Sequence, residues 1–314
     1  MSLRIIDPHL HFFNRNQGSY HWLTTGNPPF WPDKHILQRD FSLADLAFES
    51  SHTQLKNICT VDKSITLAGF VHIEAGFDNS KPWRELEYLQ TLTADNSILL
   101  TSRTIASVNL LDTPKLFKQT LAKLQQYSSL IGVRHILDEQ TLPILEAENS
   151  QLNLASLNDI SDFIFELQLP LADKHVADIM PLLLKTLSQH QQLRFIINHA
   201  GFPPLVRSGS TGRQWQKNMA ALANLNNVFV KCSGAEMVAR DYQIQWFSEV
   251  VADCISLFSI SRVMLASNFP LCLLSNKTYS KYWQDIVASP LIKQANTEQK
   301  NALLHDNALR IYQL

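Results

Sequence analysis

Eight short runs of apolar residues recur along the chain, and this recurrence constrains the fold more than any other feature. Each run is about as long as a strand and is rich in Ile, Val, Leu or Phe. The runs are Arg4–Ile6, Leu67–Glu74, Ile98–Leu110, Leu130–Leu137, Phe163–Leu169, Leu193–Asn198, Val228–Cys232 and Arg262–Ala266. Uninterrupted apolar runs are typical of parallel strands that are buried on both faces. The sequence therefore predicts eight parallel strands.

Segments with helical periodicity separate these runs. They are Phe41–Lys56, Trp83–Leu92, Lys115–Gln126, Val176–Gln189, Arg213–Leu225, Tyr242–Phe258 and Thr297–Ile311. Strands that alternate with helices predict either a parallel (β/α)8 barrel or a doubly wound sheet. Periodicity does not choose between the two. No glycine-rich dinucleotide-binding turn follows the first run, which disfavours a nucleotide-binding doubly wound sheet.

Length and composition restrict the class of protein. The chain has 314 residues, of which 45% are hydrophobic, and α/β barrels often run this long as one domain, so we expect residues 1–314 to form a single domain. The formal net charge of −1 gives no reason to expect a nucleic-acid partner. The first residues do not read as a secretory signal, and no apolar stretch is long enough to cross a bilayer. The four cysteines form no CxxC pair, so we expect free thiols and a cytoplasmic protein without a membrane partner.

Three histidines lie where strands are expected to end. His9 and His11 are two residues apart at the end of the first run, and on a strand such residues point to the same face. His199 follows the sixth run and precedes a glycine, at the end of a barrel where active sites lie. Each histidine alone is also compatible with an incidental position. Together they predict a site for one divalent metal, zinc or manganese.

Other polar side chains lie on or after the same runs. His72 and Glu74 alternate, so they should share a face, either as part of the site or as a buried pair. Arg134 ends the fourth run and could bind a substrate carboxylate or hydroxyl through its planar guanidinium, with a structural salt bridge as the alternative. Its neighbour His135 should face the opposite way.

Lys231 lies at the end of the seventh run and Asn268 just after the eighth, and we take both as candidates at the same end of the barrel. A polar, aromatic stretch follows the first run at residues 14–34, and long loops of this kind are often functional. Within it, His21 could approach the site and Trp22 could stack on a sugar ring. The alternative is that both simply pack over the barrel end.

Several short motifs occur together in a fixed order. They are DPHLHF (Asp7–Phe12), YHWL (Tyr20–Leu23), VHIEA (Val71–Ala75), GVRH (Gly132–His135), NHAGFP (Asn198–Pro203), KCSG (Lys231–Gly234), NFPLCLL (Asn268–Leu274) and NALRIY (Asn307–Tyr312). The set, which spans essentially the whole chain, resembles the amidohydrolase-related family of metal-dependent TIM-barrel hydrolases. Within that family it is most similar to the sugar-lactonase branch, which includes L-fuconolactonases. The resemblance implies a distorted (β/α)8 barrel.

The resemblance also assigns roles. His9 and His11 match the family's metal-binding pair on the first strand, and His199 matches the histidine of the sixth. Arg134 and Lys231 match positions near the substrate.

The chain departs from the family at two places. The aspartate that usually serves as the base for the attacking water is replaced by Asn268. The histidine of the fifth strand is missing, with only Glu166 near its place, so we do not expect a two-metal site.

The expected activity is therefore hydrolysis of a small sugar lactone or related cyclic ester, with a histidine-bound divalent metal or without metal. An amide has no useful basicity, so Asn268 would only orient a water molecule, and His72, His199 or Glu74 would have to act as the base. Two alternatives stay open. The chain could be a catalytically weak barrel that binds a sugar acid or lactone, or it could be a decarboxylase of the same superfamily.

Overall fold

Eight parallel strands form the centre of the computed structural model, which describes residues 3–46, 60–62, 65–94, 100–137 and 140–314. The strands, in spatial order, are β1 (Leu3–Leu10), β3 (Ile65–Ile73), β4 (Thr101–Ser107), β5 (Leu130–Arg134), β6 (Ile164–Leu167), β7 (Arg194–Ile197), β8 (Val228–Cys232) and β9 (Val263–Leu265). Every predicted run overlaps one of them. A short strand, β2 (Thr60–Asp62), pairs antiparallel with β3 and was not predicted.

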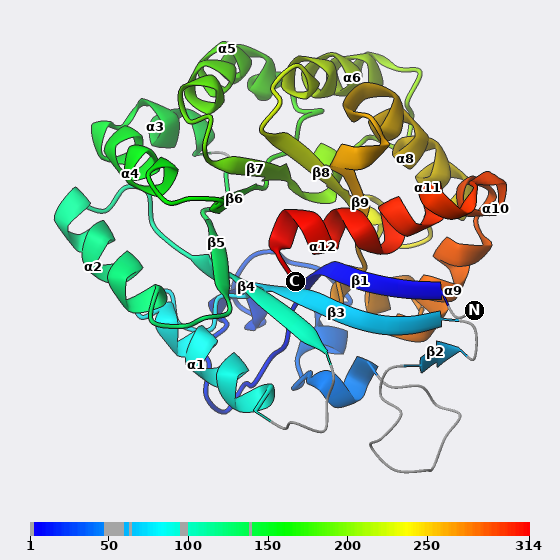
Figure 1. Cartoon of the computed structure of the whole chain (residues 1–314), viewed down its shortest axis with the longest axis horizontal. Coiled ribbons are helices and arrows are strands. Elements are labelled where there is room, and N and C mark those ends of the chain that lie inside the picture. The colour runs from blue at the N-terminus through cyan, green and yellow to red at the C-terminus, as the bar shows by residue number, and fades with distance from the viewer. Residues whose placement is uncertain (1–2, 47–59, 63–64, 95–99, 138–139) are drawn as a thin grey trace.

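The sheet curves until its first and last strands meet, as Figure 1 shows. The seam lies just after the last strand, where the main-chain nitrogen of His11 donates to the oxygen of Phe269 at 2.7 Å. The nitrogen of Asn268 donates to the oxygen of His9 at 2.9 Å. These bonds make a nearly closed barrel, so the predicted distorted (β/α)8 fold is confirmed.

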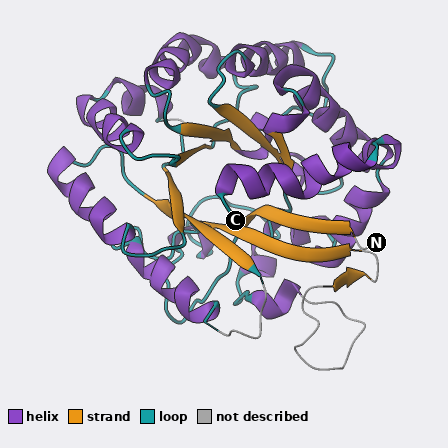
Figure 2. Ribbon diagram, in the orientation of Figure 1, coloured by secondary structure: helices purple, strands orange, loops and turns teal. Residues whose placement is uncertain are grey.

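Helices surround the barrel (Figure 2). Those that were predicted are α1 (Trp83–Leu92), α2 (Pro114–Leu124), α5 (Lys174–Gln189), α6 (Ser210–Ala223), α8 (Ile244–Phe258) and the C-terminal pair α11 (Thr297–Asn301) and α12 (Asn307–Tyr312), which a π-helical turn joins. Those that were not predicted are α3 (Thr141–Glu146), α4 (Glu148–Asn158), α7 (Ala235–Val238), α9 (Tyr279–Ala288) and α10 (Pro290–Gln294). The helix predicted at Phe41–Lys56 is wrong at its start, because Phe41 forms a β-bridge with Phe13 and Leu43–Leu46 is a 3-10 turn. Residues 47–59 lie outside the described part of the chain.

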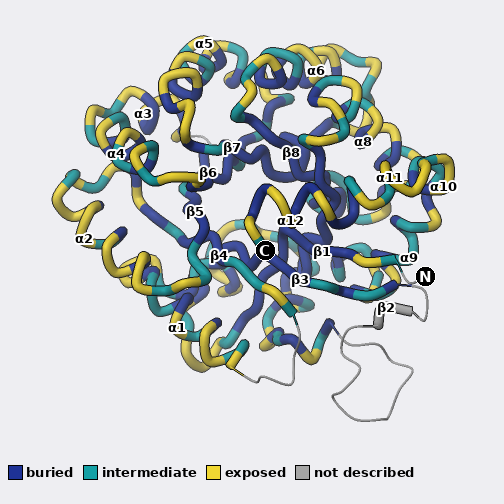
Figure 3. Tube along the Cα trace, viewed as in Figure 1, coloured by how far each residue is buried: buried dark blue, intermediate teal, exposed yellow. Residues whose placement is uncertain are grey.

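The inside of the barrel is a packed core of its own (Figure 3). Each of the eight strands supplies at least one residue to it, among them Ile6, Ile105 and Met264. Helix α12 adds Ile311 and Tyr312 to the same cluster. This helix lies at the end where the strands begin. Arg103, near the start of β4, donates to the main-chain oxygen of Gln313, just beyond the helix, and Arg194, at the start of β7, donates to that of Ile311. The opposite end of the barrel is therefore left for a site.

None of the helices in the described ranges is long and apolar enough to span a membrane.

Candidate active site

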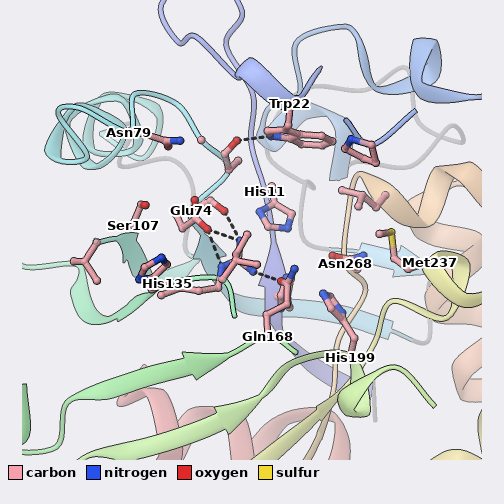
Figure 4. Close-up of a pocket in the computed structure, with 18 of the residues that line it drawn as sticks. His11, Trp22, Glu74, Asn79, Ser107, His135, Gln168, His199, Met237 and Asn268 are labelled. Carbon is pink, nitrogen blue, oxygen red and sulfur yellow. Dashed lines mark hydrogen bonds and ion pairs between the residues drawn. The ribbon is translucent and has the colours of Figure 1, made fainter. Parts of the chain in front are cut away.

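A cavity of about 660 Å³ opens at the end of the barrel where the strands finish. Most of the residues that line it come from the ends of different strands. They include His9, His11, Glu74, Arg134, His199 and Asn268. Figure 4 shows that the side chains of His11, His199 and Asn268 point toward the same space. Barrel enzymes place their chemistry at this end.

The three predicted histidines meet at the bottom of this cavity. The ring of His9 has its centroid 5.1 Å from that of His11 and 4.7 Å from that of His199. His9 and His11 belong to one extended segment, so their spacing places both on one side of it. His199 reaches the same place because the chain turns sharply after β7, where His199 has a φ of 53°.

Hydrogen bonds orient two of the rings. Nδ1 of His11 donates to the main-chain oxygen of Ile73 at 2.7 Å, which leaves Nε2 with its lone pair. Nδ1 of His199 lies 3.0 Å from Oγ of Ser233. His9 is fully buried, and neither of its ring nitrogens has a hydrogen-bond partner among the described residues. Buried nitrogens without partners are rare in proteins and call for a ligand, a water molecule or an ion.

Burial keeps the three imidazoles neutral. It lowers the pKa of His9, His11 and His199 well below 6.5, and the nearby cations Lys231 and Arg134 lower these pKa values further. Neutral imidazoles have a free lone pair on one nitrogen. The cluster can therefore accept a proton or bind a cation.

This donor set suits a single divalent metal in type, and the distances of His9 to the other two rings are compatible with one shared ion. With metal–nitrogen bonds of about 2.0–2.1 Å, two rings on one tetrahedral ion have centroids roughly 5 Å apart, as these rings do. Hydrogen bonds from the far ring nitrogens of His11 and His199 are typical of metal-binding histidines. Within the described ranges, however, no group of three His, Cys, Asp or Glu side chains forms a ready-made metal site. The rings would have to turn slightly to share an ion.

Arg134 lies on the wall of the cavity and is held by two partners. Its Nε donates to Oε1 of Glu74 and its Nη2 to the Glu74 main-chain oxygen, both at 2.8 Å. Its Nη1 donates to Oε1 of Gln168 at 2.8 Å.

The prediction that His135 faces away from the site is wrong, because this residue also lines the cavity. Strand β5 ends at Arg134, so strict alternation stops there.

His72 does not reach the cavity. The main-chain nitrogen of Phe12 donates to its Nδ1 at 3.3 Å, so the ring proton lies on Nε2, which donates to Oε1 of Glu85 at 2.9 Å. Burial lowers the pKa of His72 to about 3. Both nitrogens are occupied, and His72 cannot serve as the base we had considered. Glu74 shares the cavity wall instead, because β3 ends at Ile73 and the chain has left the strand.

Lys231 is fully buried beneath the cavity rather than on its surface. Its Nζ lies 2.6 Å from Oε2 of Glu166 and donates to the main-chain oxygen of Pro8 at 3.2 Å. Burial lowers the pKa of Lys231 to about 8, against the opposing effect of Glu166. Lys231 therefore supports the first strand from below and does not meet a substrate in this arrangement.

The two candidates in the loop after β1 have different positions. Trp22 lines the cavity, and its Nε1 donates to the main-chain oxygen of Ala75 at 2.7 Å. Trp31 lies beside it and also faces the cavity. His21 is exposed and does not line the cavity, so it does not take the substrate-binding position we had expected.

Asn268 has a neighbour that the sequence did not reveal. Its Nδ2 donates to Oε1 of Glu236 at 2.5 Å, and the Glu236 side chain is fully buried. Glu236 lies on α7, in none of the apolar runs and far from residue 268 in the chain. No spacing or motif pointed to this pair, because only the fold brings the two segments together.

With the geometry established, comparison with known proteins identifies the family. A family model described as amidohydrolase matches residues 97–314, which is more than half of the chain. The chain belongs to the amidohydrolase family. An uncharacterized protein of Sinorhizobium fredii, y4mH, is 23% identical over 99% of both chains.

Solved structures share the fold. An amidohydrolase from Burkholderia multivorans with bound zinc superposes with a TM-score of 0.74 at 19% identity, over 99% of each chain. A putative 2-pyrone-4,6-dicarboxylic acid hydrolase from Pseudomonas putida gives a TM-score of 0.65 at 18% identity, over 100% of this chain and 98% of the other. A 2,6-dihydroxybenzoate decarboxylase from Rhizobium gives 0.57 at 12% identity, over 100% and 99%. At these identities the likeness supports the barrel fold alone.

Proposed function

We propose that residues 1–314 form a single domain that hydrolyses a small, neutral cyclic ester, such as a sugar lactone. The observation that carries this proposal is the meeting of His9, His11 and His199 at the bottom of a cavity of about 660 Å³. The volume suits a small molecule. The zinc bound to the Burkholderia relative, and the hydrolase name of the Pseudomonas one, are consistent with hydrolysis.

The hydrogen bonds and the ion pair of Arg134 favour an uncharged substrate. A guanidinium has five N–H donors, and Glu74 and Gln168 occupy most of those of Arg134. The positive charge of Arg134 is already balanced by the Glu74 carboxylate, whose Oε1 lies 2.7 Å from Nη2. A substrate carboxylate that took over the charge of Arg134 would compete with Glu74, which is buried and would then lose its partner. This argues against a dicarboxylate or an aromatic acid, and so against the decarboxylase alternative.

Aromatic side chains favour a ring-shaped substrate. Trp22, Trp31 and Phe202 line the cavity above the histidines. The indole of Trp22 is fixed by its hydrogen bond to Ala75, so its position does not depend on the substrate. A rigid aromatic surface can stack on the C–H face of a sugar ring while polar groups at the bottom meet the ester.

His9, His11 and His199 would hold a divalent metal, zinc or manganese. When bound, such an ion polarises an ester carbonyl and lowers the pKa of a coordinated water from about 15.7 to roughly 7. The side chains of the protein supply orientation. Asn268, with Nδ2 turned to Glu236, presents Oδ1 as an acceptor for one hydrogen of the attacking water.

A proton-release assay with purified protein and zinc tests the proposal. We expect at least one neutral aldonolactone to be hydrolysed and the matching free acids to be left unchanged. The double variant His9→Ala/His11→Ala should lose at least about 100-fold in kcat/KM, since metal ligation and its supporting contacts carry effects of this size. The control His175→Ala removes an exposed histidine and should keep full activity.

Two results would overturn the proposal. Release of CO2 from a carboxylate substrate would show a decarboxylase. Thermal stabilisation by lactones without any turnover, in protein whose metal content is verified by elemental mass spectrometry, would show a barrel that only binds its ligand.

A further inference from the structure

A buried carboxyl group lies directly behind Asn268. Glu236, on the short helix α7, is completely shielded from solvent. Its Oε1 accepts the hydrogen bond from Nδ2 of Asn268, and its Oε2 has no hydrogen-bond partner within the described residues. Asn268 itself lines the cavity, whereas Glu236 does not. Glu236 can therefore act on the site only through Asn268.

The backbone of Asn268 cannot move to accommodate its partner. Its nitrogen donates to the oxygen of His9 across the barrel seam, and its oxygen accepts hydrogen bonds from the nitrogens of Leu271 and Cys272. Its φ of 57° lies in the left-handed region, where asparagine is tolerated better than most residues. The freedom that is left is a flip of the side-chain amide, which exchanges Oδ1 and Nδ2.

The partner of an amide decides which way it points. An ionised Glu236 can only accept a hydrogen bond, so it binds Nδ2 and leaves Oδ1 of Asn268 for the cavity. A protonated Glu236 can donate its O–H to Oδ1, which favours the flipped amide with Nδ2 facing the cavity. An N–H group in that position cannot accept a hydrogen bond from water.

We propose that Glu236 is a positioning residue that turns the carbonyl oxygen of Asn268 toward the attacking water when it is ionised and withdraws it when it is protonated. This inference rests on the proposed function, in which Oδ1 of Asn268 holds that water. The pair keeps a carboxylate close to the cavity, one side chain further from it than Asn268.

The buried surroundings of Glu236 place the ionisation of its carboxyl group near neutral pH. Burial raises the pKa of Glu236 to about 7, and the hydrogen bond from Asn268 opposes the rise. The titratable or charged groups around it are Arg240, Tyr242, Cys272, Lys277 and Tyr282.

The two cations have other partners. Arg240 pairs with Asp33 and donates to the main-chain oxygen of Glu236, not to its carboxylate. Lys277 pairs with Asp285 at 3.1 Å. Neither cation forms a salt bridge with the Glu236 side chain in the described structure. The effect of burial on the pKa of Glu236 is therefore larger than the effect of the cations.

Side-chain amide NMR tests the inference without relying on activity. In protein labelled with ¹⁵N at asparagine, the Asn268 resonance is assigned by its loss in Asn268→Asp. We expect this resonance to shift with a midpoint near pH 7 and to stay constant in Glu236→Gln, whose side chain accepts a hydrogen bond but does not titrate. The control Glu146→Gln changes an exposed carboxyl and should leave the titration unchanged.

Kinetics supply the second readout. With the lactone substrate, we expect kcat/KM of the wild type to fall about tenfold per pH unit below the Glu236 pKa, as for any group required in its ionised form. Glu236→Gln should lose the part of this limb that Glu236 contributes, so that its activity falls less steeply with decreasing pH. The exchange Asn268→Asp/Glu236→Gln keeps an amide-to-carboxylate hydrogen bond but moves the charge to residue 268, and it should also be more active than the wild type on the acid side.

An Asn268 resonance that does not respond to pH across neutrality in the wild type would overturn the inference. An unchanged acid limb in Glu236→Gln would overturn it as well. If no lactone is hydrolysed, the proposed function fails, while the NMR titration still decides whether Glu236 controls the amide.

Discussion

Glu236 also makes the stability of the fold depend on pH. Its pKa is about 7 in the folded chain against an ordinary value of 4.5, so between these pH values the folded chain holds a proton that the unfolded chain has released. The free energy of unfolding should therefore fall as the pH rises through this window, by up to about 1.4 kcal/mol per unit. The stabilising contribution of Glu236 is complete at pH values below its pKa in the unfolded chain, and it is lost above its pKa in the folded chain. Urea denaturation of wild type and Glu236→Gln at several pH values should give a smaller slope for the variant, and equal slopes would contradict the assignment.

The salt bridge of Arg134 controls selectivity between neutral and anionic ligands. In Glu74→Gln, the guanidinium keeps a hydrogen-bond acceptor but loses its compensating charge. A ligand carboxylate should then bind better, by about tenfold or more, since charged hydrogen bonds are worth about 1.5–3 kcal/mol. Calorimetric titration with an aldonate and its lactone measures the change, with Glu146→Gln as the control. Equal aldonate affinity in the variant and the wild type would show that Arg134 does not meet the ligand.

Among single residues, the sequence correctly identified those that lie at the ends of strands. His9, His11 and His199 come together because they follow runs that the apolar pattern identifies. The pattern failed where the chain leaves a strand, since His72 and Glu74 do not share a face across the end of β3. It could not find Glu236, whose partner is set by the closure of the barrel.

Between elements, a buried ion pair joins β6 to β8 inside the barrel. Lys231 and Glu166 are both fully buried, and Tyr312 donates to the second oxygen of Glu166 at 2.5 Å. Lys231→Met should destabilise the fold by about 3–5 kcal/mol, because it leaves a buried carboxylate uncompensated. Lys231→Met/Glu166→Gln should recover at least half of that loss in chemical denaturation. A double variant as unstable as the single one would show that packing, not charge, dominates here.

The strands were easier to predict than the helices for a physical reason. A strand buried on both faces needs an uninterrupted apolar run, and each of the eight runs overlaps one strand. Helix α4 was missed because its buried side includes Ser150 and Asn153, which give no apolar periodicity. Asn153 instead donates to main-chain oxygens of the loop after β4, a contact that only the folded chain reveals.

On the scale of the whole molecule, one end of the barrel contributes to stability and the other forms the candidate site. Helix α12 covers the end where the strands begin, and the cavity occupies the other. Ile311→Ala should therefore cost about 2–5 kcal/mol of stability, as other large-to-small changes in a core do. Lactone turnover per folded molecule should stay unchanged. A loss of turnover at full folding would show that the two ends are coupled.

Metal binding should likewise stabilise the whole molecule through the three histidines. Zinc at about 100 times its dissociation constant should raise the free energy of unfolding by about 2.7 kcal/mol, because an ion that binds only the folded chain shifts the equilibrium by mass action. His9 has two buried ring nitrogens without described partners, and such an ion would bind one of them. The melting temperature should rise by several degrees with zinc, return after chelation, and stay constant in His9→Ala/His11→Ala. The His175→Ala control should respond as the wild type does, and a zinc effect that survives loss of His9 and His11 would place the ion elsewhere.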